Sequence, residues 1–157
     1  MGKLNNHPEK ERDAQWALEV LDSALFVTLC LADGDEPYCV PLNAVVMEGK
    51  LYFHCARGGR KIDFLEKNPR VYVSAVSVAQ ALEERRSMRY KSAGAYGRAE
   101  LVPDESEEKV RALMALSMNF APSNAGNKHC AEKPNGHVRV YRVTIEEIAG
   151  KASYIEE

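Results

Sequence analysis

Residues 38–56 read YCVPLNAVVMEGKLYFHCA, two apolar, β-rich runs on either side of Glu48-Gly49. Runs of this composition favour strands, and a two-residue turn between them predicts a β-hairpin that joins Tyr38–Met47 to Lys50–Ala56. Pro41 cannot donate a hydrogen bond to a neighbouring strand, so its position indicates an edge strand or a bulge. This hairpin points to a fold built on an antiparallel sheet.

The rest of the chain adds further strands and a few separated helices. Strands are expected at Ala24–Leu31, Arg70–Ala79, Arg89–Val102 and Val138–Ile148, and helices at Glu11–Asp22, at Arg60–Lys67 and after Pro103, with Asp104 as N-cap. Gly94 and Gly97 indicate bulges or close approaches within their strand, and a long loop is expected from Phe120 to Gly136. Six short strands with few helices predict the α+β, mainly β class, and favour a small barrel because closure removes exposed edges.

Composition narrows the class of protein. A chain of 157 residues is expected to form a single domain, 1–157, in which residues 1–10 are loose. The net charge of −2 argues against a nucleic-acid partner, and no apolar run approaches the roughly 18 residues of a membrane-spanning helix. The cysteines at 30, 39, 55 and 130 form no CxxC pair and are interpreted as reduced thiols of a cytoplasmic protein. The spacing of His129, Cys130 and His137 matches no standard zinc pattern, so no metal is expected.

The register of the hairpin places polar side chains together. If Glu48-Gly49 is the turn, Met47 pairs with Lys50. The same register then sets Asn43 opposite His54, Leu42 opposite Cys55, and Pro41 opposite Ala56. Because paired residues have Cβ atoms about 4.5–5.5 Å apart, an amide and an imidazole are expected side by side.

The segment after the hairpin has the features of an anion site. Gly58-Gly59 allows a tight turn, and the helix expected from Arg60 presents free N–H groups at its start. Arg60 and Lys61 have the wrong charge for a first helical turn, and a bound phosphate explains that placement. The alternatives are a solvated basic loop and, for His54, a purely structural role in its strand.

Several short motifs resemble one known family. They are Pro41-Leu42-Asn43, Tyr52-Phe53-His54-Cys55-Ala56, Gly59-Arg60-Lys61-Ile62-Asp63, Asn68-Pro69-Arg70-Val71 and Tyr90-Lys91-Ser92 leading to Gly97-Arg98-Ala99. Together they resemble the flavin-binding split-barrel superfamily typified by pyridoxamine 5′-phosphate oxidases, and within it the nitroimidazole-resistance branch of nitroimidazole reductases.

The resemblance implies a six-stranded antiparallel split β-barrel with flanking helices, working as a homodimer with FMN at the subunit interface. By the same resemblance, Arg60 and Lys61 hold the FMN phosphate and His54 is the catalytic residue. The other cofactor-binding residues that it implies are Pro41, Leu42, Asn43, His54, Cys55, Ala56 and Ser92. The implied activity is electron transfer from NAD(P)H, through FMN, to a small-molecule acceptor such as a nitroaromatic.

The chain departs from the family in one respect. It lacks the C-terminal tryptophan and arginine elements of true pyridoxamine phosphate oxidases, since Trp16 is its single tryptophan. Oxidation of pyridoxamine phosphate is therefore not expected. The alternatives left open are a haem-binding split-barrel protein with His54 as a ligand, a flavin binder that is not an enzyme, and a dimeric structural protein without a cofactor.

Overall fold

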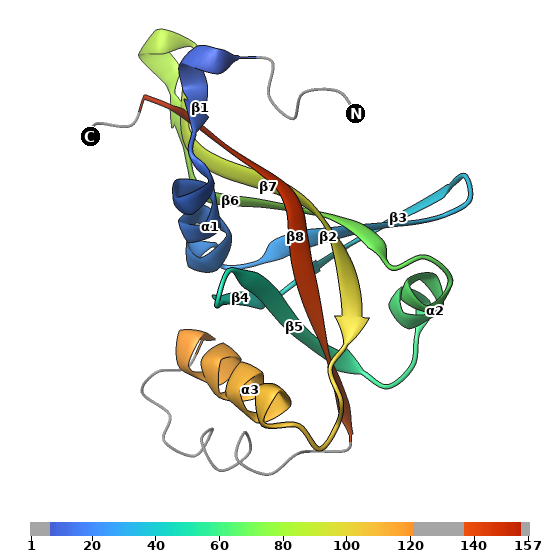
Figure 1. Cartoon of the computed structure of the whole chain (residues 1–157). Helices are drawn as coiled ribbons and strands as arrows, with labels where there is room; N and C mark the ends of the chain where they lie inside the picture. The colour runs from blue at the N-terminus through green and yellow to red at the C-terminus, as the bar shows by residue number, and fades with distance from the viewer. Residues whose placement is uncertain (1–6, 121–136, 155–157) are drawn as a thin grey trace.

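The computed structural model of the chain describes residues 7–120 and 137–154, and one antiparallel sheet with three α-helices against it dominates the fold (Figure 1). The strands are β1 (Glu11–Arg12), β2 (Val27–Asp33), β3 (Glu36–Leu42), β4 (Ala44–Met47), β5 (Lys50–Ala56), β6 (Arg70–Leu82), β7 (Ser87–Leu101) and β8 (Val138–Ser153). The helices are α1 (Ala14–Ser23), α2 (Arg60–Lys67) and α3 (Glu107–Phe120), and short 3₁₀ turns span Pro8–Lys10 and Glu83–Arg85. The predicted α+β, mainly β class is confirmed.

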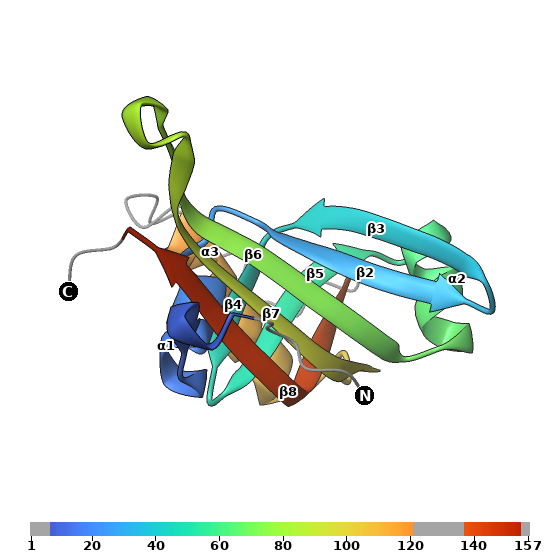
Figure 2. The same ribbon diagram turned by 90° about the horizontal axis from the view of Figure 1, so that it is seen from above.

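The order of the strands explains why the barrel is split. Hydrogen bonds join them in the order β3-β2-β6-β7-β8-β5-β4, and β1 pairs with β8. The two edge strands, β3 and β4, are consecutive in the chain, with Asn43 alone between them. Both edges of a twisted sheet can meet at one residue only if the sheet curls round on itself. No ladder joins β3 to β5 in the described part of the chain, so the predicted barrel is confirmed as an open, split one (Figure 2).

The hairpin forms where it was predicted. Glu48 and Gly49 have φ values of 53° and 73°, as a two-residue hairpin turn of type I′ requires. The predicted register holds from Met47 opposite Lys50 to Ala44 opposite Phe53.

Beyond Ala44 the predicted pairing is wrong. The expected strand Tyr38–Met47 is two strands, which with the short β1 brings the number of strands to eight instead of six. Pro41 and Leu42 lie opposite Thr28 and Val27 of β2, not opposite Ala56 and Cys55. Asn43 leaves the ladder, and its side-chain amide donates to the Leu25 carbonyl at 2.9 Å. His54 lies opposite Val140 of β8 instead of Asn43.

Two helices begin later than predicted because a neighbouring residue provides the cap. α1 begins at Ala14, since the Asp13 carboxylate accepts the Trp16 N–H at 2.8 Å and Glu11 belongs to β1. α3 begins at Glu107, because the Ser106 hydroxyl accepts the Lys109 N–H at 3.1 Å. Asp104 is therefore not the N-cap. The helix Arg60–Lys67 has its predicted bounds, and residues 121–136 of the expected loop lie outside the described residues.

Two apolar cores hold the sheet and helices together. The larger one fills the barrel interior with inward-facing strand residues, and α1 and α2 contribute to it, through Leu21 and Phe64 among others. The smaller one lies under α3, where Ala112 and Leu116 pack against Tyr52 and Val140 on the outer face of the sheet.

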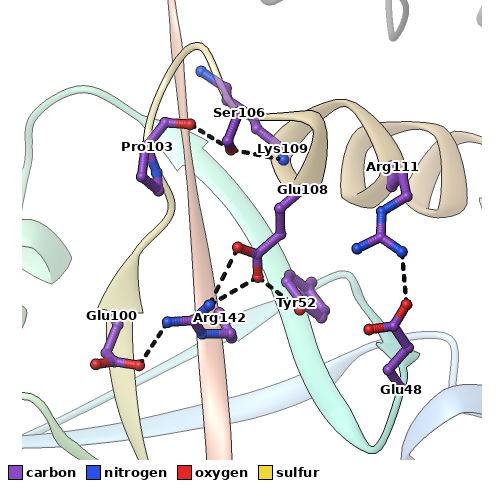
Figure 3. Close-up of polar contacts among 9 residues, drawn as sticks. All are labelled: Glu48, Tyr52, Glu100, Pro103, Ser106, Glu108, Lys109, Arg111 and Arg142. Carbon is purple, nitrogen blue, oxygen red and sulfur yellow. Dashed lines mark hydrogen bonds and ion pairs between the residues drawn. The ribbon is translucent and has the colours of Figure 1, made fainter.

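Polar contacts fix α3 to the sheet (Figure 3). The Tyr52 hydroxyl donates to Glu108 at 2.8 Å, and Arg142 donates to Glu108 at 3.0 and 3.2 Å and to Glu100 at 2.9 Å. Burial and the Glu108 carboxylate raise the pKa of Tyr52 to about 12. Lys109 is fully buried, and its ammonium donates to Asp104 at 2.8 Å and to the Val138 carbonyl at 2.7 Å.

The two strand glycines allow close approaches, as predicted. A Cβ at Gly97 would lie 2.4 Å from the Thr144 carbonyl oxygen, and one at Gly94 would lie 2.0 Å from the Tyr72 hydroxyl. The ladder between β7 and β8 also shifts register at Gly97, as a bulge does. None of the helices in the described ranges combines the length and apolar character needed to cross a membrane.

Candidate functional site

The end of β5 and the start of α2 form the candidate site. Gly59 precedes the helix with φ 122°, a conformation that side chains disfavour, and its carbonyl accepts the Ile62 N–H at 2.8 Å. The N–H groups of Arg60 and Lys61 precede that first helical bond, so they remain available to a ligand. The predicted helix start with two cations is confirmed.

Arg60 extends from α2 toward β3. It forms an ion pair with Glu36, and its guanidinium carbon lies 5.1 Å from the centre of the Tyr38 ring and 5.6 Å from that of Phe64. The Glu36 and Tyr38 contacts were missed at the sequence level, because strand and helix are distant in the chain. An incoming anion would exchange with Glu36 for the exposed guanidinium.

Lys61 differs from the other cations of this region. Arg57, Arg60 and Arg139 have carboxylate partners, which are Asp104, Glu36 and Glu66 in that order. Lys61 has no carboxylate partner among the described residues, and its ammonium lies 6.0 Å from the centre of the Phe53 ring. It is half-buried. A half-buried cation with no carboxylate beside it in residues 7–120 and 137–154 is a natural counter-ion for an anionic ligand.

His54 lies on the outer face of β5, two residues beyond Tyr52, and its side chain is exposed. It makes no hydrogen bond to another described residue. Surrounding protein atoms and, second, the charge of Lys61 lower the pKa of His54. The imidazole is therefore mostly neutral at pH 7, with one nitrogen as donor and the other as acceptor.

The other expected site residues fall into two groups. Ala56 is exposed on the outer face with His54, and Pro41 and Asn43 are exposed at and just after the end of β3. Leu42 and Cys55 face the barrel core instead, and Cys55 is 8% exposed. Burial raises the pKa of the Cys55 thiol. A ligand at the surface could therefore meet Cys55 only through its backbone.

Ser92 lies far from this group within one chain. It pairs with Val76, six residues along β6 from Arg70, which places it about 20 Å along the sheet from the end of α2. Its hydroxyl donates to the Lys151 carbonyl at 3.3 Å. With Tyr72, Ser74 and others it lines a cavity of about 120 Å³ on β6, β7 and β8.

Within residues 7–120 and 137–154, no cluster of three or more histidine, cysteine or acidic side chains could hold a metal ion. His129 and Cys130 lie outside the described residues, so the sequence argument about their spacing stays an expectation.

The residues present fit a group that carries a phosphate. Arg60 and Lys61 supply two cations, of which Lys61 has no carboxylate partner in the described part of the chain, and the first turn of α2 supplies N–H donors. His54 supplies a neutral imidazole on the strand that leads into this helix. The site can therefore hold a phosphate-bearing molecule beside a group able to exchange a proton.

Comparison with known proteins gives a family match and a set of similar structures. A family model described as pyridoxamine 5′-phosphate oxidase matches residues 13–152. No curated protein shows detectable similarity.

Three solved structures illustrate the likeness. A provisionally assigned 5-nitroimidazole antibiotic resistance protein from Bacteroides thetaiotaomicron is 25% identical, with a TM-score of 0.72 over 89% of this chain and 84% of that one. A FAD-binding protein from Mesorhizobium loti is 26% identical, with a TM-score of 0.69 over 92% of this chain and 97% of that one. A FAD and heme binding protein from Mycobacterium smegmatis shares the fold at 19% identity, with a TM-score of 0.72 over 93% and 74%.

Replacing Lys61 by glutamine is expected to raise the pKa of His54. The change removes a positive charge that disfavours the protonated imidazole, while it keeps much of the side-chain length. Titration of the His54 ring by NMR measures the effect, and Arg60→Gln is the matched control because Arg60 does not contribute to this shift. An unchanged His54 titration in the Lys61 variant would contradict the proximity of the two groups.

Proposed function

Since the chain belongs to the pyridoxamine 5′-phosphate oxidase family, we propose that it is an FMN-dependent oxidoreductase. It would pass electrons from NAD(P)H to a small acceptor such as a nitroaromatic. The observation that carries the proposal is the group at the start of α2, where Lys61 has no carboxylate among the described residues and Arg60 lies beside it. FMN carries one phosphate, which one helix start with two cations can satisfy.

The choice of acceptor rests on one similar structure. The Bacteroides thetaiotaomicron protein, 25% identical over most of both chains, is described in connection with resistance to 5-nitroimidazole antibiotics. A nitroimidazole is a small nitroaromatic, and its reduction needs both electrons and protons. His54 lies exposed near the proposed phosphate site, so it can meet a small acceptor from solvent.

Each residue of the site has a separate role in the proposal. Arg60 and Lys61 bind the phosphate, and the outer ends of β3 and β5 flank the cofactor through Pro41, Asn43 and Ala56, with Leu42 and Cys55 contributing backbone. His54 orients the acceptor through its N–H and, once protonated from solvent, delivers a proton to it. The flavin, when bound, supplies the redox chemistry itself.

We also propose a homodimer, because two large apolar side chains protrude where the sheet is split. Leu25 and Phe26 are 81% and 56% exposed, and the Leu25 carbonyl holds Asn43. Ser92, about 20 Å along the sheet from α2, would then contact a cofactor held by a second copy of the chain.

Replacing Leu25 and Phe26 together by aspartate is expected to shift the protein toward a monomer, because charges in an apolar contact are costly to bury. Sedimentation velocity measures the mass. Met88→Asp, at an apolar residue 49% exposed on the β6–β7 hairpin, is the matched control. A monomeric wild-type protein with its cofactor bound would overturn the dimer.

A haem-binding function is the second candidate. The Mycobacterium smegmatis protein of the same fold is described as binding both FAD and heme. In this chain, His54 is exposed, has a lowered pKa and makes no hydrogen bond to another described residue, which suits an imidazole ligand to iron.

The absorption spectrum of the purified, untagged protein distinguishes these functions. We expect the two bands of a flavin, release of FMN identified by mass, and oxidation of NADH or NADPH that accelerates when a nitroaromatic is added. Release of FAD would show that the cofactor is FAD and not FMN, and a Soret band would favour the haem function. Bound flavin that neither nicotinamide reduces would show a binder that is not an enzyme. A colourless protein that does not bind added flavin would overturn the proposal.

Two sets of substitutions separate binding from turnover. Arg60→Gln with Lys61→Gln removes charged donors worth about 3 kcal/mol together, so the Kd for FMN is expected to rise roughly a hundredfold. His54→Ala is expected to retain FMN and to lower kcat, by about a hundredfold if proton delivery limits the rate. Fluorescence titration and steady-state kinetics measure the two effects, with Lys67→Gln, at the other end of α2, as the control. Unchanged FMN affinity in the double variant would exclude the phosphate site.

A further inference from the structure

Two cysteines face each other across the β2–β3 hairpin. Cys30 and Cys39 are direct partners in the ladder, so their side chains lie on the same face of the sheet. Both are free thiols. The hairpin turns through Gly34 and Asp35, and Asp33 pairs with Glu36 at its end.

The prolines of β3 identify the kind of pair that these cysteines form. Pro37 and Pro41 flank Cys39 at two-residue spacing, and proline has no N–H to give to a ladder. The backbone N and C=O groups of Pro37 and Pro41 therefore point away from β2. Those of Cys39 point the same way, because the orientation repeats every two residues along a strand. Such non-hydrogen-bonded pairs have Cα atoms about 4.5 Å apart, within the roughly 4.4–6.8 Å that a disulfide spans. The backbone spacing of such a pair is therefore compatible with a disulfide.

The two thiols differ in access. Cys39 is exposed on the edge strand, whereas Cys30 is half-buried between Cys39 and Tyr72 of β6. Burial, with a contribution from the Cys39 thiol, raises the pKa of Cys30 to about 11. Cys39 is thus the thiol that a small oxidant reaches first. Cys30 lies directly across the ladder, where its sulfur can attack the oxidised Cys39.

We propose that Cys30 and Cys39 are a redox-active dithiol that hydrogen peroxide converts to an intrachain disulfide. The Cys39 thiolate attacks one peroxide oxygen, the O–O bond breaks, and hydroxide leaves with Cys39 as the sulfenic acid. The Cys30 sulfur then attacks the Cys39 sulfur, and the hydroxyl group leaves as water as the disulfide forms. The two thiols lose two electrons, which reduce the peroxide to two molecules of water, and an external dithiol reverses the change.

A disulfide between Cys30 and Cys39 would restrain the edge strand β3, which contacts the candidate site. β3 also carries Glu36 and Tyr38, which contact Arg60 of α2. A disulfide at Cys39 would fix this edge strand to β2 between those contacts and Pro41. The disulfide would form within the β2–β3 hairpin whether or not a flavin binds.

The test is treatment of the full-length protein with hydrogen peroxide, followed by thiol counting and peptide mass mapping. Cys130→Ser serves as the background, because Cys130 is an additional thiol outside the described residues. We expect the loss of two thiols and of two hydrogen atoms in mass, a cross-linked pair of peptides that contain Cys30 and Cys39, and full recovery with dithiothreitol. Further substitution of Cys39 by serine should abolish the disulfide, and Cys55→Ser, at the buried inward-facing thiol, should leave it intact.

Three outcomes would overturn the proposal. They are oxidation of Cys39 to the sulfinic acid while Cys30 stays free, a disulfide between two chains, and equal disulfide formation in the Cys39→Ser protein. Circular dichroism of the Cys30→Ser and Cys39→Ser proteins shows whether each is folded. Thiol alkylation of the untreated wild-type protein, followed by peptide mapping, shows without any variant whether Cys30 and Cys39 are thiols or a disulfide.

Discussion

The organisation of this protein depends on the placement of two consecutive strands at opposite edges of one sheet. β3 pairs with β2, β4 pairs with β5, and Asn43 alone connects them. The sheet must therefore curl until its edges meet, and its ladder stays open where β3 passes β5. The amide of Asn43 is held by the Leu25 carbonyl, which fixes the chain at this crossing. The apolar interior, the outer helix α3 and the site beside α2 all take their positions from this arrangement.

The same opening explains why the candidate site lies where it does. β5 runs past the end of β4, so residues 54–56 pair with β8 on one side and have no strand on the other within the described chain. The chain then turns through Gly59 into α2, which brings two cations to the end of that free edge. Arg60 reaches across to Glu36 and Tyr38 of β3. A helix start and two strand edges thus meet at the candidate site, where Phe53 and Phe64 of the core lie against the two cations.

Sequence reasoning succeeded where the determining contacts are local. The turn at Glu48-Gly49 and the bounds of α2 follow from neighbouring residues, because glycine and Asn68-Pro69 limit the backbone directly. It failed at Asn43, because residues 38–47 have strand character throughout and only the distant β2 decides where the pairing changes. The buried Lys109 could not have been found either, since the Val138 carbonyl that accepts from it lies 29 residues away in the chain. The proposed roles of Arg60, Lys61 and His54 came from motifs, and the structure adds what surrounds each residue. Arg60 has a carboxylate partner, Lys61 has none among the described residues, and the pKa of His54 is lowered.

The prolines of β3 bear on how the molecule behaves at high concentration. An open barrel leaves an edge strand whose backbone groups could recruit a strand from another molecule, the first step toward fibrous aggregates. On β3 the outward-directed positions are Pro37, Cys39 and Pro41, so two of the three lack the hydrogen that such recruitment requires. The edge therefore accepts hydrogen bonds but can donate few. The opening that creates the candidate site is in this way kept from becoming a template for misassembly.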